Sequence, residues 1–470
     1  ALFRTGFLVI AGVFAASLSS AIGSLLGAPR VLQSVARDNL IPSLRPFAKG
    51  ALRGDEPHRA LFLTFGITVV IILWAGPDSQ GSAFNTLAAV VTMFFLFTYG
   101  LVNLAAFIEH IAGNPSYRPR FKYSHWMTGL AGAAGCALAA FLIDPWAAAL
   151  AAFFLTGLYI LLRRMVLNVR FGDARWGFLY SRLRNNLIAL SKRSADPKNW
   201  RPTILVLTGN PKTRLTMARY ALWLGEDRGL VILARILVGD LTDIHRLRGA
   251  AIEQLSGFLR ENNFDALPAV MVSKDLDEGI CALIQGQSLG ALQPNIVMMG
   301  WSSDLNRSDA FIKHLYSVSH LGRSIILVSD KGLPEKGIKK RIDIWWRGKK
   351  NGSLMVLLGH LLTLNWEWRG SEIRLNRVIR NEAGRRPATD ALDALIKDAR
   401  VKATVSVIVS EETFKDILHR HSRDASLIML GTQLPDPADA RQFQIMTGQV
   451  MDGLPTTLIV CSSGEADLFE

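Results

Sequence analysis

The sequence predicts an α-helical membrane bundle followed by an α/β domain, and three observations lead to that prediction. Half of the 470 residues are hydrophobic and the mean hydropathy is +0.23, which is high for a purely soluble chain. The apolar residues gather before about residue 162, in five long segments. After them, short β-branched runs alternate with helical stretches, which is typical of an α/β fold.

A chain of this length is too long for one domain. We expect residues 1–166 to form a membrane domain, 167–200 a linker, and 201–330 and 331–470 two α/β units. The chain begins with neither an initiator methionine nor a signal-peptide pattern, so we expect it to be the C-terminal part of a longer protein.

The first apolar segment, Phe7 to Ala28, is the most informative. It has no charge over about 22 residues, which at about 1.5 Å per residue matches a hydrocarbon core of about 30 Å. The hydroxyls of Ser19 and Ser20 lie on a packing face of small residues and could coordinate a hard cation where water is scarce, so a transporter is the leading hypothesis. Those small residues recur at every fourth position in two rows: Gly12, Ala16, Ser20, Ser24 and Ala28, and Ala15, Ser19, Gly23 and Gly27.

The other four predicted spans each add a constraint. The third carries polar groups that would be costly facing lipid, so we expect them to face protein or a wet cavity. The turn between the fourth and fifth spans is only Asp144-Pro145, which predicts a tight antiparallel hairpin. The spans are Ala60 to Ala75, Phe84 to Ile108, Trp126 to Ile143 and Trp146 to Leu162, and the polar groups of the third are Thr92, Thr98, Tyr99 and Asn103.

The formal net charge is +14, and many of the basic residues lie in alternate loops between the predicted spans. The turns Gly76 to Ser82 and Asp144-Pro145 have no Lys or Arg, whereas the alternate loops are basic. This pattern obeys the positive-inside rule and predicts that the basic loops and the α/β part are cytoplasmic. Nucleic-acid binding is therefore not favoured. The basic residues are Arg30, Arg37, Arg45, Lys49, Arg53 and Arg59, then Arg118, Arg120 and Lys122, then Arg163, Arg164 and Arg170.

Enzyme chemistry has no support in the sequence. Cys136, Cys281 and Cys461 have no paired spacing, so neither a disulfide framework nor a zinc site is indicated. The nine histidines are scattered, and no carboxylate lies inside a predicted span. We expect no catalytic residues, no cofactor and no metal other than transported ions.

Ten strands are expected in the α/β part, in two series of five. Each series alternates with amphipathic stretches such as Leu241 to Arg260, which predicts a parallel, doubly wound sheet and two related units. The first series is Thr203 to Leu207, Leu230 to Val238, Ala269 to Val272, Asn295 to Met299 and Ser324 to Val328, and the second is Ile342 to Trp346, Glu372 to Val378, Ala403 to Val409, Ser426 to Leu430 and Thr456 to Cys461.

Two features of the α/β part, a loop and a group of cations, could each bind a ligand or have only a structural role. The loop Thr208-Gly209-Asn210-Pro211 follows a strand, where amides can bind phosphate, but it lacks a glycine-rich nucleotide motif and a plain turn is favoured. Cations around the Trp345-Trp346 strand could meet anionic lipid or RNA, although a solvated connector is favoured. These cations are Lys336, Lys339, Lys340, Arg341, Lys349 and Lys350.

Landmark strings spread over nearly the whole chain resemble the cation-chloride cotransporters of the amino acid-polyamine-organocation superfamily, and their order and spacing together are specific. They are Ala15-Ala16-Ser17-Leu18-Ser19-Ser20, Gly27-Ala28-Pro29-Arg30-Val31-Leu32-Gln33, Arg37-Asp38-Asn39, Gly54-Asp55-Glu56-Pro57, Phe94-Phe95-Leu96-Phe97-Thr98-Tyr99, Tyr117-Arg118-Pro119-Arg120-Phe121-Lys122-Tyr123, Asn199-Trp200-Arg201-Pro202 and Ile342-Asp343-Ile344-Trp345-Trp346.

The resemblance implies that the five spans are helices eight to twelve of a LeuT-type inverted-repeat transporter in the plasma membrane. The α/β part would be the family's cytosolic domain, with two universal-stress-protein-like units that dimerise the transporter. Its partners would be inorganic ions, membrane lipid and a second copy of the chain.

The resemblance also implies site residues. The sodium site of the family matches the Ala16 carbonyl and the Ser19 and Ser20 hydroxyls, and the inner chloride site matches Tyr99. Potassium-chloride members carry Gly-Ala in place of Ser19-Ser20, so these hydroxyls favour the sodium-coupled branch. Residues 27–33 and 118–126 resemble the potassium-chloride branch at least as much, and potassium use stays open.

From the residues alone, Ser19 and Ser20 could instead bond carbonyls of their own helix, and Tyr99 could be a packing tyrosine. The expected function is a secondary active cation-chloride symporter, sodium-coupled and possibly using potassium. Two other functions stay open: a membrane-anchored signalling protein whose α/β domain binds a ligand, and a related amino-acid transporter.

Overall fold

The computed structural model describes residues 2–38, 41–51, 54–76, 82–112, 125–164, 174–193, 199–225, 228–288, 290, 292–335 and 339–465. These divide into two compact units, Ala1–Asn185 and Asn186–Glu470. Several predicted features lie outside the described residues: most of the turn between the second and third spans, the basic loop with Arg118, Arg120 and Lys122, and single cations at Arg53, Arg170 and Lys336. The predicted domain boundaries stay predictions.

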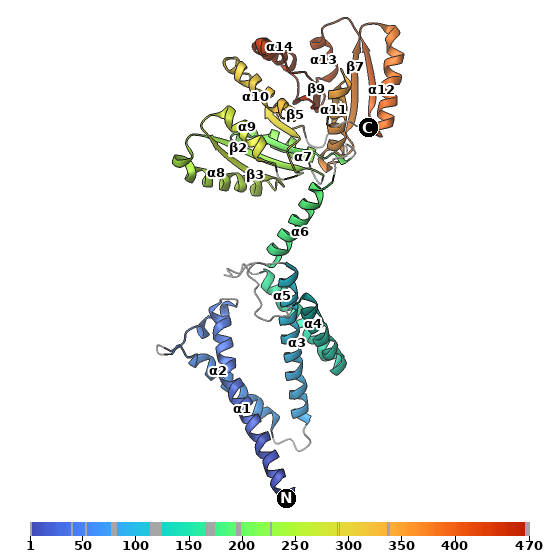
Figure 1. The fold of residues 1–470 in the computed structure, drawn as a ribbon. Helices are drawn as coiled ribbons and strands as arrows, with labels where there is room; N and C mark the ends of the chain where they lie inside the picture. Colours follow the sequence, from blue (N-terminus) through green and yellow to red (C-terminus); the bar gives the residue numbers. More distant parts are fainter. Residues whose placement is uncertain are drawn as a thin grey trace. The chain divides into compact units, whose positions relative to one another are not determined.

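The first unit is helical (Figure 1). Four of its helices are long and apolar enough to cross a membrane, and a fifth is apolar over the shorter stretch Pro145–Ile160. Each predicted span lies within one of these helices, and the crossing of the membrane by all five stays a prediction. The helices are α1 (Leu2–Arg37), α2 (His58–Ala75), α3 (Ser82–Ala112), α4 (Trp126–Ile143) and α5 (Pro145–Arg164), with the short helix η1 (Pro42–Phe47) between α1 and α2 and the polar helix α6 (Ala174–Ser191) after α5.

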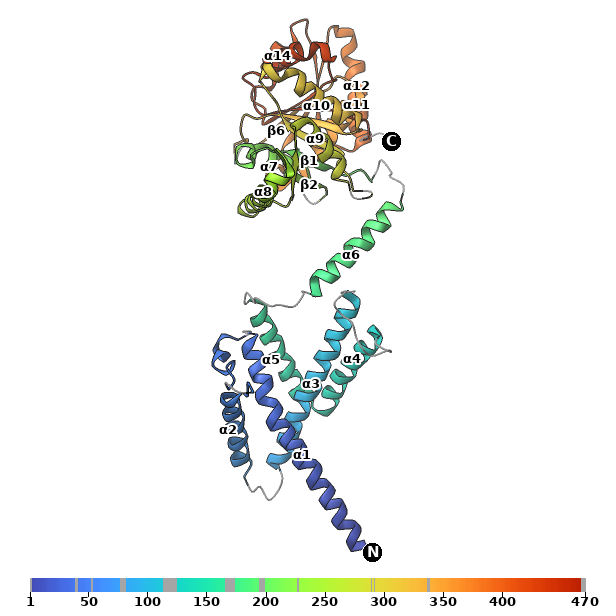
Figure 2. The same ribbon diagram turned by 60° about the vertical axis from the view of Figure 1, so that its left-hand side comes forward.

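Helices α3 and α4 pack side by side through glycines (Figure 2). A Cβ atom added to Gly132 would lie 2.6 Å from Asn103 Oδ1, and one added to Gly129 would lie 3.0 Å from the Asn103 carbonyl oxygen. Because these glycines have no side chain, α4 reaches the polar side chain and backbone of α3. Asn103 thus faces protein, as predicted.

The predicted hairpin between the fourth and fifth spans is present. Helix α4 ends at Ile143 and α5 begins at Pro145. The Oδ1 atom of Asp144 accepts hydrogen bonds from the backbone N–H groups of Trp146 and Ala147, at 3.0 and 3.1 Å. This carboxylate therefore caps the first turn of α5.

The second unit contains one ten-stranded sheet, and all ten predicted strands are confirmed (Figure 1). The strand order is β3-β2-β1-β4-β5-β10-β9-β6-β7-β8. The strands are β1 (Thr203–Leu207), β2 (Leu230–Val238), β3 (Leu267–Ser273), β4 (Ile296–Gly300), β5 (Ser324–Ser329), β6 (Arg341–Trp345), β7 (Glu372–Ile379), β8 (Thr404–Val409), β9 (Leu427–Gly431) and β10 (Thr457–Cys461).

The sheet is built from two repeats, β1 to β5 and β6 to β10, with the same internal strand order and parallel pairing. Thr203 pairs with Leu230 in the first repeat, as Arg341 pairs with Glu372 in the second. The repeats join where β5 runs antiparallel to β10, with Ile326 opposite Val460. The sequence predicts two related units but not that they share one sheet.

Helices cover both faces of this sheet. Helix α8 confirms the amphipathic stretch predicted at Leu241 to Arg260 and ends one residue later. The first repeat carries α7 (Leu215–Gly225), α8 (Leu241–Glu261), α9 (Leu276–Gly286) and α10 (Ser308–His320), and the second carries α11 (Lys349–Leu364), α12 (Arg385–Ala399), α13 (Phe414–Ser422) and α14 (Ala440–Met451).

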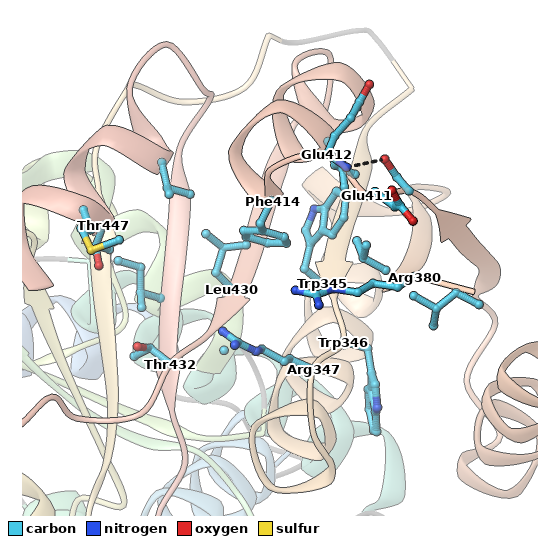
Figure 3. Close-up of a pocket in the computed structure, with 18 residues that line it drawn as sticks. Trp345, Trp346, Arg347, Arg380, Glu411, Glu412, Phe414, Leu430, Thr432 and Thr447 are labelled. Carbon is cyan, nitrogen blue, oxygen red and sulfur yellow. Dashed lines mark hydrogen bonds between the residues drawn. The ribbon is translucent and has the colours of Figure 1, made fainter. Parts of the chain in front are cut away.

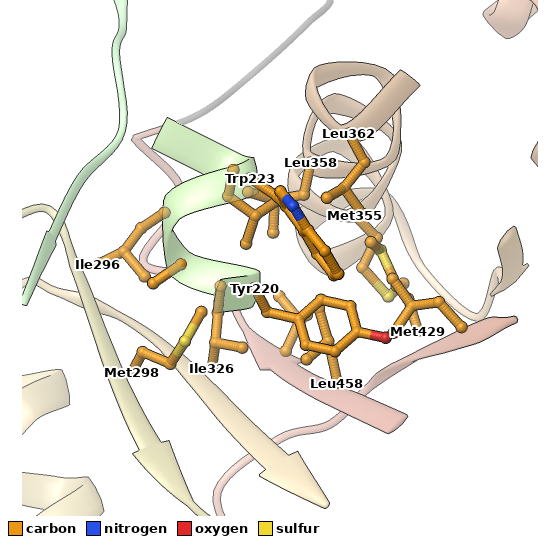
Figure 4. Close-up of a cluster of buried hydrophobic side chains, with 14 of the residues drawn as sticks. Tyr220, Trp223, Ile296, Met298, Ile326, Met355, Leu358, Leu362, Met429 and Leu458 are labelled. Atoms are coloured by element: carbon orange, nitrogen blue, oxygen red, sulfur yellow. The ribbon is translucent and has the colours of Figure 1, made fainter. Parts of the chain in front are cut away.

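The largest core cluster spans both repeats. Helix α7 contributes Tyr220 and Trp223, which pack near Leu358 and Leu362 of α11 (Figure 4). The Trp223 ring lies 5.5 Å from that of Trp368, which follows α11. Burial raises the pKa of Tyr220 far above its ordinary value. The two repeats therefore share one interior and form a single folded body.

Lys340 and the loop after β1 are the two features of the sheet unit for which the sequence left a ligand contact open. Lys340 is buried, donates to the Glu367 carbonyl oxygen at 2.6 Å and lies 5.0 Å from the centre of the Trp368 ring, so it is part of the core rather than a solvated connector. In the loop after β1, Asn210 Oδ1 accepts from the Lys212 N–H at 3.2 Å and Gly209 has φ +59°. That loop has the geometry of a plain turn.

Candidate functional site

Helix α1 carries the three predicted cation ligands within one turn. It continues through Pro29 to Arg37, beyond the predicted end of the span at Ala28. In an α-helix the carbonyl of residue 16 lies beside the side chains at positions 19 and 20, so one turn can present three oxygens. The side chains of Ala16, Ser19 and Ser20 are all exposed along this helix.

The hydroxyls of Ser19 and Ser20 differ from other hydroxyls of the unit. Within the part of the chain that the structure describes, neither makes a hydrogen bond. By contrast, the Oγ1 atoms of Thr92, Thr98 and Thr156 each donate to the carbonyl four residues earlier, at 2.7 to 2.8 Å. Back-bonding to the helix, the alternative to ion coordination, is therefore seen at the threonines and not at the two serines.

Tyr99 lies in α3 and is 58% exposed. Its ring stacks on that of Phe95, with centroids 6.1 Å apart and an interplanar angle of 14°. The Tyr99 carbonyl oxygen accepts from Asn103 Nδ2 at 2.9 Å, whereas its hydroxyl has no partner among the described residues. This hydroxyl is free to donate to an anion.

The structure does not assemble these positions into one site. Among the described residues, neither Ser19 nor Ser20 makes a hydrogen bond to Tyr99, and no group of three or more His, Cys, Asp or Glu could hold a metal ion. Thr92 and Thr98, predicted to face protein or a cavity, are exposed. Their hydroxyls are satisfied inside α3, so they need no neighbouring helix.

A group of polar contacts at the end of α1, here called the polar clamp, was not predicted from the sequence. The Arg37 side chain pairs with the Asp55 carboxylate and donates from Nε to the Ala48 carbonyl oxygen at 3.0 Å. Buried Gln33 donates to the Asp55 carbonyl oxygen at 3.3 Å. Gly54 and Asp55 have φ of +75° and +53°, so the Gly-Asp pair was the available signal. The clamp ties the helix that carries the serines to the segment before α2.

Comparisons with known proteins show which families the chain resembles. The family model for amino acid permeases matches residues 4–206, and the model for solute carrier family 12 matches residues 214–322. Solute carrier family 12 member 2 of Danio rerio is 32% identical over 302 residues, which cover 64% of this chain and 26% of that protein. The chain spans about a quarter of the length of the curated relatives it matches.

Solved structures also resemble the chain. The cytoplasmic domain of a prokaryotic cation chloride cotransporter matches with a TM-score of 0.43 and 17% identity, covering 57% of this chain and 99% of that one. A universal stress protein from Archaeoglobus fulgidus matches with a TM-score of 0.40 and 11% identity, covering 56% of this chain and 97% of that one.

The two family models together match more than half of the chain, and both describe membrane transporters. This confirms the prediction that the chain is not an enzyme. The order along the chain, a set of apolar helices followed by an α/β unit, agrees with the predicted fold class. The chain therefore resembles membrane transporters along most of its length: amino acid permeases over residues 4–206 and solute carrier family 12, the cation-chloride cotransporters, over residues 214–322.

Proposed function

We propose that the chain is the C-terminal portion of a secondary active symporter that moves a cation together with chloride. Helices α1 to α5 would be spans eight to twelve of an inverted-repeat bundle in the plasma membrane. The sheet unit would be its cytosolic domain, with each repeat resembling a universal stress protein. The similarity to solute carrier family 12 supports this function. Its sodium-coupled form is supported by the hydroxyls of Ser19 and Ser20, which make no hydrogen bond among the described residues.

Sodium coupling requires oxygen ligands within the membrane. Ser19 and Ser20 provide two hydroxyls that are not engaged by their own helix, and the Ala16 carbonyl has a second lone pair beside them. Oxygen atoms are the ligands that hard cations prefer. A neighbouring helix of the complete transporter would supply the remaining ligands.

Chloride binding requires a hydrogen-bond donor in a cavity of low polarity. The Tyr99 hydroxyl fits because it is unpaired among the described residues and lies well inside the apolar helix α3. A hydrogen bond to a charged group contributes about 1.5–3 kcal/mol. Potassium use is left to experiment.

Uptake of radiosodium and radiorubidium into proteoliposomes that hold the full-length transporter tests the function. Uptake of either ion that depends on external chloride supports the proposal, and the ion or ions taken up identify the branch. Uptake that persists when gluconate replaces chloride would overturn it and favour amino-acid transport or a signalling role.

Substitutions in the same assay test the sites. Ser19→Ala and Ser20→Ala are expected to abolish sodium dependence, whereas Ser17→Ala, about 100° around the helix from Ala16, is the matched control. Tyr99→Phe is expected to raise the half-maximal chloride concentration about tenfold, with Tyr159→Phe in α5 as control. Unchanged sodium affinity in both serine variants would contradict the sodium site. An unchanged chloride titration in the Tyr99 variant would contradict the chloride site.

We also propose that the transporter is a homodimer joined through its sheet unit. Light scattering of the detergent-solubilised full-length protein should then give twice the mass of one chain, and a monomer would contradict the proposal.

A further inference from the structure

A cavity of about 490 Å³ opens in the second repeat of the sheet (Figure 3). Its walls come from the carboxyl ends of β6, β7, β8 and β9 and from α13 and α14. In parallel sheets, ligands bind at this edge, near the point where the strand order reverses. In the second repeat that point lies between β6 and β9. The volume is within the range of about 300–1,000 Å³ that is typical of small-molecule sites.

The inner wall of the cavity is aromatic and ordered by contacts. Trp345, at the end of β6, and Phe414, at the start of α13, meet edge to face with ring centroids 5.4 Å apart. The Trp345 indole donates from Nε1 to Ser422 Oγ at 3.0 Å, which holds the ring in place. Phe414 is 45% exposed because it borders the cavity. A flat apolar group could stack here without rearrangement of the wall.

The mouth of the cavity carries unneutralised positive charge. Arg347 and Arg380 follow β6 and β7, and their guanidinium groups point into the cavity (Figure 3). Within the described residues, neither makes an ion pair or a hydrogen bond. Of the two carboxylates at the rim, that of Glu412 is paired with Arg420 at 2.8 Å, which leaves Glu411 against two arginines. The planar guanidinium fork suits a phosphate or carboxylate.

The equivalent edge of the first repeat is occupied by the chain itself. The register of the repeats places Gly300, at the end of β4, where Gly431 ends β9. The Arg214 guanidinium lies against Gly300, where it takes the place that a Cβ atom would occupy. At Gly431 in the second repeat, the three atoms nearest to that position belong instead to Asn351 and Met355. The second repeat thus keeps a cavity and two arginines at its mouth.

We propose that this cavity binds a small amphiphilic anion. Its flat apolar body would lie against Trp345 and Phe414, and its phosphate or carboxylate would be held by Arg347 and Arg380. The site is independent of the ion path proposed above, because none of its residues lies in the first unit.

Calorimetric titration of naphthyl phosphate into the full 470-residue chain in lipid nanodiscs tests the site. We expect saturable binding at one site, after subtraction of empty nanodiscs. Arg347→Gln and Arg380→Gln should each weaken binding roughly tenfold. Arg386→Gln is the matched control, because Arg386 is an exposed arginine of α12 that does not line the cavity.

Naphthol, which lacks the anionic group, separates the two parts of the site. Its weaker binding should be unchanged by the arginine substitutions and reduced by Phe414→Ala. Both arginines are exposed, so their replacement should leave the unfolding temperature unchanged. If wild type shows no saturable binding of naphthyl phosphate, or if the double arginine variant binds it as tightly as wild type, the proposal is wrong.

Discussion

The two repeats of the sheet share topology and register but differ in what one face buries. Leu205 of β1 pairs with Ile232 of β2, and both belong to an apolar cluster. At the matching positions of the second repeat, Asp343 of β6 pairs with Arg374 of β7. One parallel β-sheet topology therefore tolerates either an apolar pair or an ion pair at the same place in its interior.

The buried carboxylate in the second repeat has several hydrogen-bond partners. Asp343 is fully buried, and its carboxylate accepts from Arg374 Nε and Nη2 at 3.1 and 2.7 Å and from Ser422 Oγ at 2.7 Å. Arg341 Nε lies 3.2 Å from the same carboxylate. Ser422 also accepts from Trp345, the wall of the cavity. The ion pair is not needed for the topology, but it links α13 to β6 and β7 and orients Trp345.

The largest expected effect comes from breaking the ion pair on one side. Asp343→Asn keeps the shape of the side chain but leaves Arg374 without its counter-charge, so the free energy of unfolding should fall by about 3–5 kcal/mol. Denaturant unfolding of the detergent-solubilised chain, followed by tryptophan fluorescence, measures this. Asp393→Asn, on the exposed side of α12, is the control. Unfolding of the Asp343 variant at the wild-type denaturant concentration would contradict the argument.

Replacing the ion pair of the second repeat by the apolar pair of the first tests whether the second repeat needs its charges. The double variant Asp343→Leu and Arg374→Ile carries the residues of the first repeat. It should recover about 2 kcal/mol relative to Asp343→Asn, because the guanidinium of Arg374 is removed together with the carboxylate and only the partly exposed Arg341 loses its counter-charge. The same unfolding experiment decides the point. A double variant less stable than Asp343→Asn would show that the second repeat requires its charges.

A smaller effect is expected where the helices of each repeat meet. In the first repeat the His314 side chain of α10 bonds the Asp277 carboxylate of α9, whereas in the second His419 Nε2 of α13 bonds the Val450 carbonyl oxygen of α14 at 3.1 Å. The hydrogen bond from His314 lowers the pKa of the Asp277 carboxyl from its ordinary value of 3.8. The contact between Asp277 and His314 in the first repeat is therefore sensitive to acid.

Asp277→Asn should lower the free energy of unfolding at pH 7 by up to about 1 kcal/mol, because the carboxylate is partly exposed and screened. A lowered pKa stabilises the fold fully above pH 3.8, and this stabilisation is lost as the pH falls through the folded-state value. The difference between variant and wild type should thus narrow below about pH 4. Asp309→Asn, in the first turn of α10, is the control. If the difference in unfolding free energy between the Asp277 variant and wild type did not change with pH, the contact between Asp277 and His314 would not be its cause.

Much of this protein was determined by local sequence. Short β-branched runs identify strands and apolar runs of spanning length identify membrane helices, because both signals depend on neighbouring residues in the sequence. All ten strands were predicted from such runs. The Ser19-Ser20 turn was equally local, since residues three and four apart share a helix face. The clamp between Arg37 and Asp55 was missed because its partners are separated by a loop whose shape depends on positive φ.

Only the tertiary structure decided how these elements combine. Strands β5 and β10 are far apart in the chain, and no local pattern encodes their antiparallel pairing. That pairing places α7 against α11 and creates the shared core. The register likewise places Asp343 opposite Arg374 and leaves the cavity at the carboxyl edge of the second repeat. Periodicity specifies which face of an element is apolar, whereas its partner depends on long-range packing of the whole chain.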